Sequence, residues 1–337
     1  MSNMKDFIIE NGVLAKYIGT DTEVVIPDVV TEIGVEAFLD KKTITSVEIP
    51  KTVKAIGREA FFRCEGLKKL VIPESVKSKV GDGAFSCCSG LTDIVLPKAM
   101  KSIGNRAFYK CSSLEKITLP SGITKIGVMA FSECSSLSKI VIPDSVTTIE
   151  TSAFSKCVNL SDITFSKSLQ KIGSQSFYGC ESIADVTLFS AIADIGSNAF
   201  ENCKAIKNVS IANPDAKIGG YSFRGCSNIS KVSISKKLSD KVMSWWQECF
   251  ENDVISIIML QNFDSSAKIA KQVLKDRVKC ILLLIAKGRF DLIEKVFDCS
   301  EKPKPKEFDA IFAEIMKTQN PEAITLLLEY KRANYSE

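Results

Sequence analysis

Histidine is missing from this sequence, and its net charge is small. The chain has 337 residues, with 44 Lys and Arg against 40 Asp and Glu, which gives a formal net charge of +4. Without histidine there can be no Ser–His or Cys–His catalytic pair and no histidine metal ligand. A charge this small predicts neither nucleic acid nor an anionic membrane as the partner.

Long apolar runs are also missing. The longest, residues 280–286, is far shorter than the roughly 20 residues of a spanning helix, so no membrane span is predicted. Near the N-terminus, Asp6 and Glu10 bracket only Phe7, Ile8 and Ile9, whereas a secretory signal needs about 7–15 apolar residues. The N-terminus therefore predicts a cytoplasmic protein. A chain whose signal had already been removed would look the same, so the compartment stays open.

Motifs that mark a catalytic or cofactor site are absent as well. The sequence contains no Gly-rich phosphate loop and no Cys-x-x-Cys pair, and its carboxylates show no convergent pairing. We therefore predict no enzymatic activity, no cofactor, no metal site and no small-molecule substrate.

What the sequence does contain is a repeat of 23 residues, broken once by one extra residue near residues 77–78. Its most regular marker is a phenylalanine, found at Phe38, Phe61, Phe85, Phe108, Phe131, Phe154, Phe177, Phe200 and Phe223. In every copy but the first, a cysteine follows three residues later, at Cys64, Cys88, Cys111, Cys134, Cys157, Cys180, Cys203 and Cys226. Aliphatic residues follow each phenylalanine at fixed distances, and an Ile-Gly or Val-Gly step precedes all but one of them.

The repeat predicts an α/β solenoid of about nine units. The spacing Leu-x-x-Ile-x-Ile is that of a short strand, which a following proline ends. The sequence x-Ala-Phe-x-x-Cys is compatible with a short helical turn. One unit cannot bury its apolar edge alone, so the units should stack with a parallel sheet along one side. The phenylalanines and the cysteines should then form two buried columns, called here the phenylalanine ladder and the cysteine ladder. We expect the ladder cysteines to be reduced and to act as small apolar residues.

These motifs resemble the BspA-type leucine-rich repeat, Ile-Pro-x-Ser-Val-Thr-x-Ile-Gly-x-x-Ala-Phe-x-x-Cys-x-x-Leu-x-x-Ile. Residues 142–163 are close to it, apart from Glu150 in the glycine position, and the resemblance covers about residues 24–235. It implies an arc-shaped leucine-rich-repeat solenoid. Because many members are surface or secreted proteins implicated in adhesion and protein binding, it also implies a surface location, against the cytoplasmic one that the N-terminus predicts.

We expect three parts in the chain: a β cap over residues 1–26 with a hairpin turn at Asn11-Gly12, the solenoid over residues 27–238, and an all-α domain over residues 239–337. In the last part, one helix should follow an N-cap at Asp264 and another should begin at Pro321. Residues 286–293 and 320–328 are similar to the inner edge of ankyrin repeats, although a generic helical domain fits equally well. Trp245, Trp246 and Phe250 should pack at the junction with the solenoid, a surface binding patch being the alternative.

The predicted function is a protein-binding scaffold or an adhesin-like protein that recognises a protein partner. The alternative is a structural or self-associating spacer whose C-terminal helices carry the recognition. The candidate binding residues are the charged outward positions of the predicted strands, expected on the concave face beside a row of Val and Thr, although a merely solvated surface is the competing interpretation. These candidates are Lys69, Asp93, Lys116, Lys139, Asp162, Asp185 and Lys231.

Overall fold

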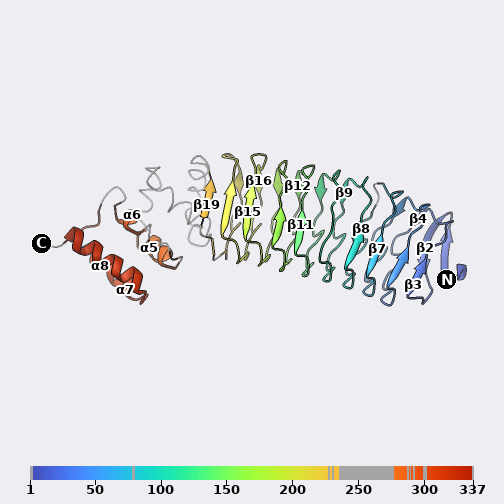
Figure 1. The fold of residues 1–337 in the computed structure, drawn as a ribbon, viewed down its shortest axis with the longest axis horizontal. Helices are drawn as coiled ribbons and strands as arrows, with labels where there is room; N and C mark the ends of the chain where they lie inside the picture. The colour runs from blue at the N-terminus through green and yellow to red at the C-terminus, as the bar shows by residue number, and fades with distance from the viewer. Residues whose placement is uncertain are drawn as a thin grey trace.

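The repeat units stack side by side in chain order and form a solenoid (Figure 1). This is seen in a computed structural model that describes residues 3–77, 80–226, 228–229, 231–234, 277–286, 288, 290, 293–298 and 302–335. The predicted Asp264 N-cap, Trp245, Trp246 and Phe250 lie outside these residues.

The predicted parallel sheet is confirmed along one side of the solenoid. Its strands alternate between exposed and buried residues, as in β7, where Leu70 is buried between exposed Lys69 and Val71. In-register pairing joins neighbouring units, so that Lys139, Ile140 and Val141 lie opposite Asp162, Ile163 and Thr164. The strands are β3 (Glu23–Val25), β5 (Ser46–Glu48), β7 (Lys69–Val71), β8 (Asp93–Val95), β11 (Lys139–Val141), β13 (Asp162–Thr164), β15 (Asp185–Leu188), β17 (Asn208–Ile211) and β19 (Lys231–Ile234).

The strand that the repeat predicts over residues 114–119 does not form. Only one isolated bridge, from Lys116 to Lys139, links this segment to β11, and no strand pairing joins it to β8. The sheet is therefore split into sets of strands, β3-β5-β7-β8, β11-β13 and β15-β17-β19.

A second parallel strip, which the periodicity did not predict, runs along the solenoid at the Ile-Gly step. Its repeat strands are two residues long and pair with the same step of neighbouring units, as Ile149 does with Ile172. The strip is interrupted between β6 and β9, where Ile56 and Val80 make only an isolated bridge. The strands are β4 (Glu32–Ile33), β6 (Ala55–Ile56), β9 (Ser102–Ile103), β10 (Lys125–Ile126), β12 (Thr148–Ile149), β14 (Lys171–Ile172), β16 (Asp194–Ile195) and β18 (Lys217–Ile218).

The segment around each phenylalanine is a turn with left-handed residues and not a helix. Positive φ angles recur two residues before and two residues after the phenylalanine, as at Met129 (φ 55°) and Glu133 (φ 62°) beside Phe131. The turns are joined through their backbones, since the Phe131 N–H donates to the Ala153 carbonyl of the next unit at 2.7 Å. Only three of these left-handed positions carry glycine, at Gly83, Gly179 and Gly225.

Glycine at an exposed left-handed position should stabilise the protein. Gln175 is exposed with φ 57°, a conformation that costs a side chain roughly 1–2 kcal/mol. Gln175→Gly should raise the free energy of unfolding in urea by up to about 1 kcal/mol, the entropy of the unfolded glycine offsetting part of the gain. The matched control, Gln170→Gly at an exposed position without positive φ, should lower it by about 0.5–1 kcal/mol. Equal effects of the two substitutions would contradict the turn geometry.

The phenylalanine ladder forms as predicted. Its rings are at most 2% exposed, and successive ring centroids lie 4.8–5.6 Å apart with interplanar angles of 4–16°. Tyr17 extends the column toward the N-terminus, since its ring lies 5.3 Å from that of Phe38. The apolar core is thus continuous from the first strands to the last repeat.

The cysteine ladder is buried as well, and each of its thiols has a polar partner. Every ladder Sγ donates to the carbonyl of the phenylalanine in the preceding unit, at 3.0–3.2 Å, as Cys134 does to Phe108. This contact explains why the first repeat lacks the cysteine. Lys41 stands there, no phenylalanine unit precedes it, and its Nζ donates to the Gly19 carbonyl at 2.9 Å.

The N-terminal residues form a short 3-10 helix, η1 (Met4–Asp6), and an antiparallel hairpin of β1 (Phe7–Glu10) and β2 (Val13–Tyr17). The hairpin turn at Asn11 and Gly12 has positive φ at both residues, as the sequence predicted. Because β2 also pairs in parallel with β4, the hairpin covers the end of the second strip.

The described C-terminal elements are helices α5 (Arg277–Ala286), α6 (Ile293–Asp298), α7 (Pro305–Met316) and α8 (Pro321–Tyr335). The predicted start at Pro321 is confirmed, because the Asn320 side chain accepts from the Ala323 N–H at 3.0 Å. An aromatic cluster packs the helices together, with the Phe297 ring 4.7 Å from Tyr330 and 5.3 Å from Phe308. Their resemblance to ankyrin repeats stays a prediction.

Candidate functional site

The candidate binding residues lie in one row along the split sheet. The register places Lys69 beside Asp93, Lys139 beside Asp162, and Lys116 beside Lys139. Asp93 is half-buried, while Lys69, Lys116, Lys139, Asp162 and Asp185 are exposed. The surface that they share with the neighbouring outward side chains of the same strands is called here the strand face. The backbone of Lys231 continues the row in β19, and its side chain lies outside the described residues.

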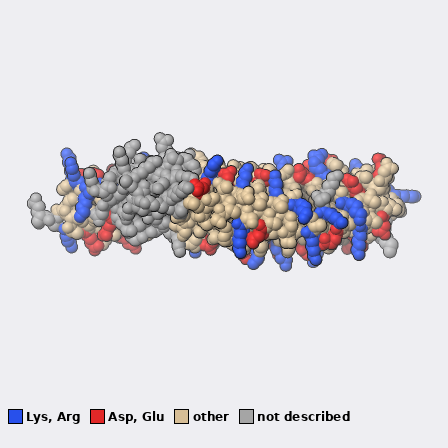
Figure 2. All heavy atoms as spheres, turned by 90° about the horizontal axis from the view of Figure 1, so that it is seen from above, with Lys and Arg blue, Asp and Glu red and all other residues tan. Residues whose placement is uncertain are grey.

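Some of these side chains are already paired with one another. Lys139 Nζ lies 2.6 Å from Asp162 Oδ2, and the Asn208 amide donates to Asp185 Oδ1 at 2.6 Å. Exposed pairs of this kind contribute only about 0–1 kcal/mol, so a partner can replace them at little cost. Lys69 and Lys116 make no ion pair among the described residues. On the side of the molecule that Figure 2 views, Lys and Arg are spread along the length of the array, with Asp and Glu between them.

A second row of the strand face is rich in valine in its N-terminal half, where Glu48 and Thr118 interrupt it. Val25, Val71, Val95 and Val141 are 47–61% exposed. The equivalent residues of later units are Thr164, Thr187 and Ser210. Val71 and Val95 lie side by side on paired strands, and adjacent exposed apolar side chains are a common mark of an interaction surface, which distinguishes the first half of the array from the second.

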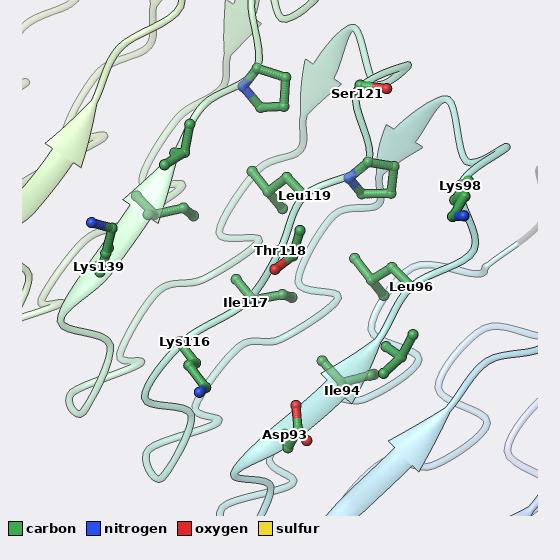
Figure 3. A pocket seen from close by; sticks show the side chains of 15 residues that line it. Asp93, Ile94, Leu96, Lys98, Lys116, Ile117, Thr118, Leu119, Ser121 and Lys139 are labelled. Carbon is green, nitrogen blue, oxygen red and sulfur yellow. The ribbon is translucent and has the colours of Figure 1, made fainter.

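Two hollows open on the strand face in this valine-rich half. One, of about 660 Å³, lies over β8, residues 116–121 and β11 (Figure 3). The other, of about 820 Å³, lies over β3, β5 and β7. They are called here the central hollow and the N-terminal hollow.

Sequence reasoning missed part of the wall of these hollows. Lys51, Glu74, Lys98 and Ser121 line them, and each directly follows the proline of its repeat unit. That fixed place in the repeat is the signal that could have found them, because the chain leaves the sheet there and folds back beside it.

The cysteines offer no reactive centre within the ladder. Burial raises the pKa of the Cys64 thiol to about 12 and holds that of Cys111 well above its usual range, which keeps both groups protonated and poorly nucleophilic. Among the ten cysteines that the structure describes, Cys87 is half-buried and the others are buried.

Among the residues that the structure describes, no group of three or more Cys, Asp and Glu side chains could hold a metal ion. In the same residues, no helix has the length and apolar character that crossing a membrane requires.

This chain is similar to known leucine-rich repeat proteins. A family model described as a BspA type leucine-rich repeat region matches residues 31–161 and 147–279. A leucine-rich repeat protein from Bacteroides ovatus is 28% identical, over 69% of this chain and 68% of that one, with a TM-score of 0.52. A leucine-rich repeat protein of T. pallidum is 23% identical over 72% of this chain and 94% of its own, with a TM-score of 0.39. The pneumococcal vaccine antigen PcpA is 17% identical over 66% and 76%, with a TM-score of 0.37. The comparison with curated proteins gives no match.

Proposed function

The chain belongs to the BspA type leucine-rich repeat family, a family of repeat scaffolds, and we propose that it is a non-enzymatic scaffold that binds a protein partner through the strand face. The observation that carries this proposal is a set of half-exposed valines that line two hollows beside a row of exposed lysines. Extended repeat arrays offer such surfaces to other proteins, and an apolar floor with a charged rim is the usual composition of a protein interface.

Charge reversal in the row of candidate residues should abolish partner binding. The full chain carrying Lys69→Glu, Lys116→Glu and Lys139→Glu should retain its partner at least about tenfold less well than the wild type, because like charges then face one another across the interface. Binding is measured by immobilising each protein, passing an extract of the source cells over it and quantifying the retained proteins by mass spectrometry.

The matched control makes the same charge change at the second strip, with Lys171→Glu in β14 and with Lys54→Glu and Lys101→Glu directly before β6 and β9, all at exposed positions. It should retain the partner as the wild type does. Loss of the partner in both triple variants would indicate a non-specific effect of charge, and retention by both would move the binding site off the strand face.

In the alternative, the C-terminal helices carry the recognition. A chain shortened to residues 1–238 should then lose the partner, whereas it should keep the partner if the strand face binds. If that chain melts cooperatively and still retains the partner, the solenoid is the binding module. If it melts in the same way and loses the partner while the strand-face variant keeps it, the solenoid is a spacer.

A surface-displayed, adhesin-like role is the finer form of this proposal, and it rests on the family resemblance alone. Labelling intact source cells with a membrane-impermeant reagent tests it. A tagged protein supports the adhesin-like role, whereas an untagged protein found in the soluble fraction contradicts it and directs the search for partners to the cell interior.

A further inference from the structure

The central hollow lies where the sheet is split. Residues 116–119 are joined to β11 by a single bridge and to β8 by no strand pairing. No backbone hydrogen bond involves the N–H or the carbonyl of Thr118 or Leu119, both within the described residues. Backbone polar groups in a sheet are ordinarily paired, so this segment leaves hydrogen-bonding capacity beside the hollow.

The floor of the central hollow is apolar. Ile117 and Leu119 are each 7% exposed, similar to the equivalent Ile94 and Leu96 of the preceding unit at 4% and 7%. Val95 and Val141, on the strands to either side, are 51% and 50% exposed. In Figure 3, Ile117, Thr118 and Leu119 lie in the middle of the hollow. The floor can therefore accept a large apolar side chain that no group of the described chain fills.

The rim of the central hollow is positively charged. Lys98, Lys116 and Lys139 line it, with Asp93 as its one acidic residue. All three lysines are exposed, and among the described residues only Lys139 has an ion-pair partner, Asp162. In Figure 3 the lysines stand around the apolar residues of the floor.

The N-terminal hollow has a similar apolar floor and a different rim. Glu23, Glu48 and Glu74 line it together with Lys51 and Lys69. Its acidic residues outnumber its lysines, whereas the reverse holds in the central hollow. The two hollows are therefore a matched pair within one face, alike in their floors and different in the sign of their rims.

We infer that the central hollow binds an extended acidic segment of the partner protein, with one large apolar side chain on the floor over Ile117 and Leu119 and carboxylates at Lys98 and Lys116. This rests on the proposed function and names the chemistry of the occupant. The unpaired backbone beside Thr118 adds hydrogen bonds that an extended peptide can use. Charge complementarity selects an acidic segment over a basic one, and the N-terminal hollow selects against the same segment.

The test uses the full chain and a defined probe, a fluorescein-labelled peptide Asp-Glu-Trp-Glu-Asp, with binding measured by fluorescence anisotropy at low salt. The wild type should bind this peptide, and the affinity should fall as salt is added. Two control peptides should bind at least about tenfold more weakly, which corresponds to about 1.4 kcal/mol. They are the same peptide with Gly in place of Trp, and the basic peptide Lys-Lys-Trp-Lys-Lys.

Protein variants locate the peptide. Lys98→Glu with Lys116→Glu should weaken binding of the acidic peptide at least about tenfold, or about 1.4 kcal/mol. Thr118→Trp, at an exposed position on the floor, should weaken it as much by filling the hollow without changing any charge. The control, Lys54→Glu with Lys171→Glu, makes the same charge change at exposed positions that line neither hollow, and it should leave the affinity of the wild type unchanged.

Three results would overturn the inference. The first is no binding of the acidic peptide at millimolar concentration, and the second is equal binding of the acidic and basic peptides. The third is concentration-dependent dimerisation in sedimentation that Lys98→Glu with Lys116→Glu abolishes, because a second copy would then occupy the hollow. If the peptide fails while the strand-face triple variant still loses its partner, the acidic occupant is wrong and the proposed function stands. If that triple variant keeps its partner, the proposed function is wrong.

Discussion

Replacing Phe131 by alanine is expected to lower the free energy of unfolding by about 3–5 kcal/mol, the usual cost of deleting a buried ring. Phe131 is fully buried, and its ring centroid lies 5.2 Å from those of Phe108 and Phe154. Because each repeat packs only on its neighbours, a cavity in the middle of the ladder weakens the units on both sides of it. Urea unfolding, followed by circular dichroism, measures the effect.

The control for this experiment is Phe62→Ala, one position outside the ladder. Phe62 is half-buried beside Arg63, and its truncation should cost much less than that of Phe131. Phe131→Leu keeps most of the buried volume, so the stability that it loses should lie between the losses caused by Phe62→Ala and Phe131→Ala. A Phe131→Ala protein that unfolds at the same urea concentration as the wild type would contradict the ladder.

The second large effect is a loss of stability at alkaline pH. Burial raises the pKa of Cys64 from 9.0 to about 12 and also raises the pKa values of Cys88, Cys111, Cys180 and Cys203. Below pH 9 the thiols are protonated in both states, and their contribution to stability is complete. Above it, the unfolded chain releases protons that the native ladder keeps. Stability should then fall by about 1.4 kcal/mol per pH unit for each buried thiol, until the native pKa is passed.

This pH dependence can be assigned to the ladder with one variant and one control. Cys134→Ala with Cys157→Ala removes two thiols whose pKa values burial raises. Between pH 9 and 11, the decline of unfolding free energy with pH should become shallower by about 2–3 kcal/mol per unit. Ile140→Val, which lowers stability without removing a thiol, should keep the slope of the wild type. An unchanged slope in the cysteine variant would show that other groups cause the alkaline loss.

The solenoid and its two ladders were predictable because a repeat constrains its own packing. When each unit can bury its apolar edge only against copies of itself, a fixed period places every Phe on a Phe and every Cys on a Cys. The missing cysteine of the first unit fits this packing as well. Lys41 stands where no preceding phenylalanine carbonyl needs a donor.

The features that the sequence did not predict depend on backbone conformation more than on residue type. Met129 and Glu133 do not reveal their positive φ angles, so the turns looked compatible with a helix. The two-residue strands of the second strip are too short for an alternating pattern to mark them. The split at residues 116–119 is the clearest case, because Ile117 and Leu119 keep the repeat while the strand pairing does not form. The row of candidate binding residues was predictable from the repeat, but the two hollows on the strand face were not.

The most direct test of the central claim, that the strand face binds a protein partner, is quantitative capture from source-cell extract by three full-length proteins side by side. These are the wild type, the strand-face triple variant of Lys69, Lys116 and Lys139, and the second-strip control of Lys54, Lys101 and Lys171. The account predicts one set of proteins retained by the wild type and the control and lost from the strand-face variant. An identical set retained by all three proteins would contradict it.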